Sequence, residues 1–168
     1  MTSGWFPGKG RDADDEAFLA ELRGCAETRG LVDANPQDTT LHVWEHTLIV
    51  LVAVPGLQDL PEKPTLEVIC DPHSGPPSMM VGCETDGYVA DAYEELDLAG
   101  AELTPPGLAR SAFGWFDAQL RRPMEKAIWR SWWRERCVVR FADTGEPVWE
   151  RLDDRLRGRP PASVVRLR

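Results

Sequence analysis

The spacing of apolar residues along the chain predicts two helices. Asp14–Thr28 has apolar residues at helical intervals, acidic residues in its first turn and Gly30 as a stop. Gly107–Arg122 repeats apolar residues every three or four positions and ends before Pro123. Each helix should therefore pack one apolar face against a core.

Between the helices, the pattern predicts a three-stranded antiparallel meander. Thr39–Val54 is the strongest strand signal, polar and apolar in its first half and continuously apolar in its second. Pro55 and the following glycine end it. Two shorter strands, Thr65–Cys70 and Ser78–Glu84, are joined by a stretch rich in turn-forming residues.

The remaining segments alternate between connectors and short strands. Residues 85–102 are an acidic connector with one helical turn at 90–96, and a strand near 127–133 follows the second helix. A strand over 135–142 then precedes a turn and a last strand over 147–152. The proline at the start of this last strand places it at a sheet edge.

These elements predict an α+β fold in one domain, since 168 residues suit a single core. An antiparallel sheet of about five strands packs against two helices, in the order α-β-β-β-α-β-β. The domain covers 14–152, between a flexible N-terminal arm, 1–13, and a mobile basic tail, 153–168. This order is similar to that of the small dimeric chaperones of secretion systems, but no motif assigns the chain to a family.

The net charge of −9 argues against nucleic-acid binding, which needs a basic surface. The charge is unevenly divided, however. Residues 1–104 hold 5 Lys or Arg and 20 Asp or Glu, whereas residues 105–168 hold 14 and 8. The halves can face each other within one molecule or across a symmetric dimer, or the basic half can meet an acidic partner. We favour the first interpretation, because opposite charges on one chain can satisfy each other.

Cysteine usage and hydropathy predict a cytoplasmic protein with no membrane segment. The four cysteines are far apart, without a C-x-x-C pair, and no secretory signal precedes them. The longest apolar run, Leu48–Val54, is far shorter than the roughly 18 residues of a membrane span.

Two groups of residues raise the question of metal binding. Cys70, His73 and Cys83 form a C-x-x-H…C pattern whose sulfur and imidazole ligands suit zinc, but a fourth ligand is not evident. Buried cysteines acting as small apolar residues are the favoured alternative. His42 and His46, if on a strand, lie about 13 Å apart, too far for one ion. We therefore predict no metal and no cofactor.

Asp143-Thr144-Gly145 resembles the signature of the aspartic proteases, in which two such loops bring two carboxylates together. The chain has one copy, and Glu146 stands where that family places a small residue. A hairpin turn uses the same residues, with glycine at positive φ, and is the favoured interpretation. Because no other catalytic motif occurs, the sequence gives no positive support for an enzyme.

Arginine and tryptophan, which are enriched at interaction hot spots, are concentrated after the second helix. The candidate partner surface consists of Arg121, Arg122, Arg130, Trp132, Trp133 and Arg134. We predict a non-enzymatic protein-interaction module that binds a partner protein or a second copy of itself. The alternative is a small enzyme or ligand-binding protein with a pocket between sheet and helix, binding metal at the Cys70, His73 and Cys83 positions.

Overall fold

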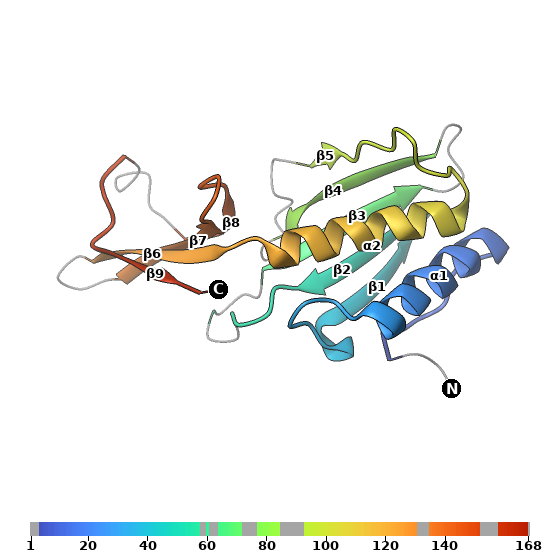
Figure 1. Cartoon of the computed structure of the whole chain (residues 1–168), viewed down its shortest axis with the longest axis horizontal. Helices are drawn as coiled ribbons and strands as arrows, with labels where there is room; N and C mark the ends of the chain where they lie inside the picture. Colours follow the sequence, from blue (N-terminus) through green and yellow to red (C-terminus); the bar gives the residue numbers. More distant parts are fainter. Residues whose placement is uncertain are drawn as a thin grey trace. The chain divides into compact units, whose positions relative to one another are not determined.

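The computed structural model describes residues 4–57, 60, 64–71, 77–84, 93–130, 135–151 and 158–167. It confirms an α+β fold with two helices, but the prediction of a single sheet is wrong. The described strands form two antiparallel sheets, one of five and one of four strands (Figure 1). The chain divides into two compact units, residues 1–120 and 121–168. Among the described residues, no helix combines the length and apolar character needed to span a membrane.

Helix α1 extends over Ala13–Arg29, close to the prediction, and its ends show why it forms there. The Asp12 carboxylate caps the helix by accepting hydrogen bonds from the backbone N–H groups of Asp14 and Asp15. Gly30 ends the helix at φ 67°, the left-handed conformation in which glycine is favoured.

Helix α2 covers Pro105–Arg121, again close to the prediction. The Thr104 hydroxyl accepts a hydrogen bond from the Gly107 N–H, and the Thr104 carbonyl accepts one from the Leu108 N–H. Prolines at the first two positions cost the helix no hydrogen bond, because N–H groups there have no partner within the helix. The buried face comprises Gly107, Leu108, Ala109, Ala112, Phe113, Phe116 and Leu120.

The stretch predicted as one long strand is in fact a hairpin. It consists of β1, Thr39–Trp44, and β2, Thr47–Ala53, paired antiparallel across a turn at Glu45 and His46. The turn falls where the mixed half of the stretch meets the apolar half. Sequence reasoning missed it because Glu45, at φ 49°, occupies a conformation usually taken by glycine.

Replacing Glu45 with glycine should raise the free energy of unfolding by about 0.5–1 kcal/mol. Left-handed backbone at a non-glycine residue costs about 1–2 kcal/mol, and added freedom of the unfolded chain offsets part of the gain. Arg11 donates a hydrogen bond to the Glu45 carbonyl, which glycine retains. Urea denaturation measures the change, and Glu45→Ala is the control, because alanine keeps the strain. A glycine variant no more stable than the alanine variant would show that the turn carries no strain.

The five-stranded sheet has the order β1-β2-β3-β4-β5 and confirms the meander within it. Its further strands are β3, Thr65–Asp71, β4, Ser78–Glu84, and β5, Glu94–Glu95. Strand β5 replaces part of the predicted helical turn at 90–96, whose first residues lie outside the described part of the chain. Both helices lie over one face of this sheet (Figure 1). Its buried side chains include Leu48, Val50, Val52, Leu66, Val68 and Cys70.

The four-stranded sheet has the order β8-β7-β6-β9. Its strands are β6, Met124–Arg130, β7, Glu135–Phe141, β8, Pro147–Arg151, and β9, Ser163–Arg166. The first three were predicted within a few residues. Strand β9, within the segment expected to be a mobile tail, pairs antiparallel with β6. The sequence did not reveal it, because a four-residue strand among arginines and prolines has too few apolar positions to show a period.

The segment before α1 packs against the rest of the first unit, although the sequence suggested a flexible arm. Phe6 is fully buried, and its ring centroid lies 6.3 Å from that of Phe116. The Phe6 N–H donates to the Thr39 hydroxyl at 2.8 Å, and the Phe6 carbonyl accepts from Arg23 Nη2 at 2.8 Å. A single aromatic residue thus fixes this segment to both a helix and the sheet.

Candidate functional site

The two edges of the five-stranded sheet differ in how they are protected against pairing with another chain. Strand β5, at one edge, is two residues long and both are glutamates. Strand β1, at the other edge, has six residues, none of them Lys, Arg, Asp, Glu or Pro. Short length and charge are the usual devices that prevent a sheet edge from adding a further strand. The β1 edge has neither.

The four-stranded sheet shows the same difference. Strand β8, at one edge, begins with Pro147, and its register to β7 is irregular between Val139 and Arg140. Proline and bulges both discourage further pairing. Strand β9, at the other edge, has no proline and a single charged residue, Arg166. We call β1 and β9 the open edges.

Exposed apolar side chains are concentrated on the open edges. Among the described residues, six large apolar side chains are exposed, and five of them lie on β1 or β9 or directly after β9. Their exposed fractions are 39% for Val43, 69% for Trp44, 47% for Val164, 48% for Val165 and 37% for Leu167. An unprotected edge bearing apolar side chains is typical of a pairing site.

Arg122 holds the turn that contains Asp143-Thr144-Gly145 between β7 and β8. Its Nη2 donates to Asp143 Oδ1 at 2.9 Å and to the Thr144 hydroxyl at 2.8 Å. The guanidinium carbon also lies 3.6 Å from the centroid of the Phe141 ring. The Arg122 hydrogen bond lowers the pKa of Asp143, which favours the charged carboxylate.

This geometry confirms that the aspartic-protease-like triplet is a turn. Gly145 has φ 75°, and its N–H donates to the Phe141 carbonyl at 2.8 Å. A protease would instead set its aspartate beside a second carboxylate that raises one pKa. Asp143 is paired with an arginine, an arrangement that stabilises a turn.

The predicted partner surface is only partly described. Arg122 lies before the start of β6, Arg130 is the last residue of β6, and Arg121 is exposed at the end of α2. Arg130 Nε lies 3.2 Å from Glu135 Oε2, so the charge of Arg130 already has a partner. Trp132, Trp133 and Arg134 lie outside the described residues. A partner surface in the segment between β6 and β7 therefore stays a prediction.

The register of β3 and β4 separates the two cysteines proposed as zinc ligands. Cys70 lies opposite Met79, whereas Cys83 lies opposite Leu66. Four residues along a strand correspond to about 13 Å, too far for one ion to bind both sulfurs. His73 lies outside the described residues, among which no three His, Cys, Asp or Glu gather at metal-binding distance. His42 is exposed on β1, and His46 is exposed in the turn that follows.

Burial raises the pKa of the Cys70 thiol to about 12. We therefore expect Cys70 to resist a thiol-specific reagent at neutral pH until the protein unfolds, because the thiolate is the reactive form. Mass spectrometry after labelling of native and urea-treated protein measures this, with half-buried Cys137 as internal comparison. Labelling of Cys70 in the native protein at the rate of Cys137 would contradict its placement in the core.

Two buried carboxylates outside the open edges have structural partners. Asp15 is fully buried, and Arg11 binds it through Nε at 2.7 Å and through its backbone N–H at 2.9 Å. Glu67, buried on β3, accepts a hydrogen bond from the Tyr93 hydroxyl. Buried charges that are bound in this way stabilise local structure and are poor evidence of catalysis.

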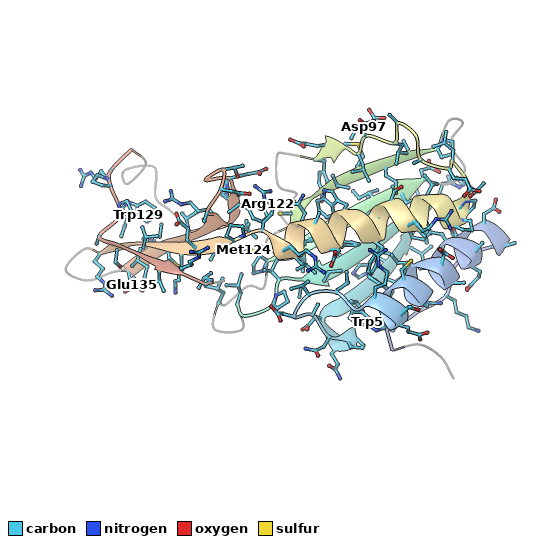
Figure 2. The ribbon with its side chains drawn as sticks, in the orientation of Figure 1. Trp5, Asp97, Arg122, Met124, Trp129 and Glu135 are labelled. Atoms are coloured by element: carbon cyan, nitrogen blue, oxygen red, sulfur yellow. The ribbon has the colours of Figure 1, made fainter. Side chains whose placement is uncertain are left out.

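Sequence reasoning placed the candidate site in the segment between β6 and β7 and missed the open edges. Trp129, on β6, donates its indole N–H to the Arg159 carbonyl at 2.9 Å (Figure 2). This bond holds the segment that leads into β9. The only sequence signal for β9 was the pair Val164-Val165 within an arginine-rich region. For β1, the signal was a run of strand-forming residues without charge.

The comparisons with known proteins leave the function to be inferred from these features. The chain matches no family model, no curated protein and no solved structure.

Proposed function

We propose that this protein is a non-enzymatic protein-interaction module that binds an extended segment of another polypeptide along an open edge. The observation that carries the proposal is the position of the exposed apolar side chains, five of six on or next to β1 and β9. In each sheet, one edge lacks the protecting features of the other: β1 lacks the short length and charges of β5, and β9 lacks the proline and irregular register of β8.

Strand addition explains why such edges are useful. An added strand bonds to the outward N–H and C=O groups of the edge strand, and these main-chain bonds supply affinity for an extended segment. Alternate side chains of the added strand then contact side chains of the edge strand on the two faces of the sheet, which supplies specificity. Val43 and Trp44 on β1 lie on opposite faces, as do Val164 and Val165 on β9.

Site-specific cross-linking in the native host tests the proposal. A photoreactive phenylalanine analogue replaces Trp44 on β1 or Val164 on β9, and the controls carry it at two exposed positions off the open edges, Leu103 and Glu146. Leu103 lies before α2, and Glu146 lies directly before the protected strand β8. Gel shifts and mass spectrometry then compare polypeptide adducts from the open edges and from the control positions.

We expect adducts to another polypeptide from an open edge and none, or far fewer, from Leu103 and Glu146. The adducts should map to one segment of the captured chain, as strand addition requires. Equal adduct yields at all four positions would indicate non-specific contact and would contradict the proposal. Absence of adducts at both Trp44 and Val164 would also contradict it.

A further inference from the structure

Backbone geometry shows which groups of β9 point away from the sheet. The Leu167 N–H donates to the Met124 carbonyl at 2.8 Å, in register with the β6–β9 ladder. Hydrogen-bonded pairs alternate along an antiparallel ladder, so Val165 and Ser163 also bond to β6. The N–H and C=O groups of Val164 and Arg166 therefore point outward, toward the space where an added strand would lie.

Both faces of the sheet carry exposed apolar side chains at this edge. Val164 lies on one face, and Val165 and Leu167 lie on the other. All three side chains are exposed, and they lie within four consecutive residues. An added strand that carries apolar residues could cover either face.

The formal charge of the second unit indicates what else the added strand should carry. Residues 121–168 hold 13 Lys or Arg and 7 Asp or Glu, a formal charge of +6. On β9 itself, Arg166 is exposed on the same face as Val164. Opposite charges across an interface favour association, whereas like charges oppose it.

Lys126 adds a second positive group on the other face. It lies on β6 directly opposite Val165 and is half-buried. Within the described part of the chain, it forms no ion pair. A carboxylate on a strand beyond Val165 would provide a partner for this ammonium group.

These observations distinguish a partner polypeptide from a second copy of the chain. Pairing β9 with β9 of a second copy would bring together two units that each carry +6. It would also place Arg166 of both copies along one short interface. Charge therefore disfavours β9–β9 pairing of two copies and favours an acidic partner segment.

We propose that the β9 edge binds an extended partner segment in which apolar and acidic residues alternate, added as a strand to the Val164 and Arg166 backbone. Apolar side chains of the segment cover the face that carries Val164, and its carboxylates lie near Lys126 on the other face. This assignment depends on the proposed function and names the partner chemistry at one of the two open edges.

A fluorescein-labelled peptide of alternating valine and glutamate tests the assignment by fluorescence anisotropy with the full-length chain. Val164→Pro removes an outward N–H while leaving the bonds to β6, because proline is tolerated where an edge N–H faces solvent. Val164→Thr is the matched control, since it keeps the N–H and the β-branched shape. A second peptide carries lysine in place of every glutamate. Circular dichroism checks that each variant is folded.

We expect Val164→Pro to weaken binding about tenfold and Val164→Thr by less than about twofold. Binding of the glutamate peptide should weaken with added salt and exceed that of the lysine peptide at least about tenfold at low salt. Equal binding of the two peptides, or equal binding by Val164→Pro and Val164→Thr, would overturn the assignment. A wild-type dimer in light scattering that becomes monomeric in Val164→Pro would overturn it too, in favour of a second copy.

A charge-reversal variant keeps the test valid if Val164→Pro does not fold. Lys126→Glu combined with Arg166→Glu should invert the preference, so that the lysine peptide binds more tightly than the glutamate peptide. An unchanged preference would overturn the assignment. Cross-linking separates this failure from failure of the proposed function. Adducts at Trp44 or Val164 without binding of the acidic peptide would overturn only the assignment, whereas absence of adducts at both positions would contradict the proposed function.

Discussion

Replacing Phe6 with alanine should lower the free energy of unfolding by about 3–4 kcal/mol. Phe6 is fully buried and stacks on Phe116, so alanine loses the buried ring and leaves a cavity in the first unit. The backbone bonds of Phe6 to Thr39 and Arg23 do not depend on the ring and should persist. An effect of this size would be unusual for a residue in a segment that looks irregular by sequence.

Urea denaturation followed by far-UV circular dichroism measures the effect. Lys9→Ala is the matched control, because Lys9 is exposed in the same segment and its replacement should change stability by less than about 0.5 kcal/mol. If Phe6→Ala were as mild as Lys9→Ala, the segment before α1 would not be docked as the structure shows.

Replacing Gly107 with alanine should lower the free energy of unfolding by about 3 kcal/mol. A Cβ atom at this position would lie 1.9 Å from the Glu102 carbonyl oxygen and 2.8 Å from the Glu102 carbonyl carbon. Backbone atoms cannot yield as a flexible side chain does, so the start of α2 or the connector before it must move. The hydrogen bond from Gly107 to Thr104 would then be displaced.

Gly114→Ala is the control for this prediction, because Gly114 is in the same helix and its Cβ would meet nothing within 4 Å. Alanine is favoured over glycine inside a helix by about 1 kcal/mol, so this variant should be more stable than wild type. Thermal unfolding of the two variants should therefore shift in opposite directions. Shifts in the same direction would mean that Gly107 is not in close contact with Glu102.

The helices and inner strands were predictable from sequence because their signals are local. The apolar period, the acidic first turn of α1 and the proline after α2 fixed both helices to within two residues. The β3 and β4 strands were found from short apolar runs bounded by turn residues. The turn at Asp143-Thr144-Gly145 was also predicted, because Gly145 supplies the positive φ.

The remaining features depend on contacts distant in sequence. The turn between β1 and β2 is formed by Glu45 and His46. Neither position is a glycine, proline or asparagine, so there was no local signal for a turn. Nothing in the strand pattern indicates that β6–β9 form their own sheet, because sheet membership follows from long-range pairing. The open edges follow from that pairing. A strand lies at a sheet edge when it has a neighbouring strand on one side only, which its own sequence does not show.

Amide hydrogen exchange of β9 tests strand addition most directly. Saturation with the alternating valine and glutamate peptide should slow exchange of the outward Val164 and Arg166 N–H groups, because the added strand bonds to them. Exchange at Val165, whose N–H already bonds to β6, should change much less. We therefore expect protection to alternate along β9. Unchanged exchange at Val164 and Arg166 under saturating peptide would contradict it.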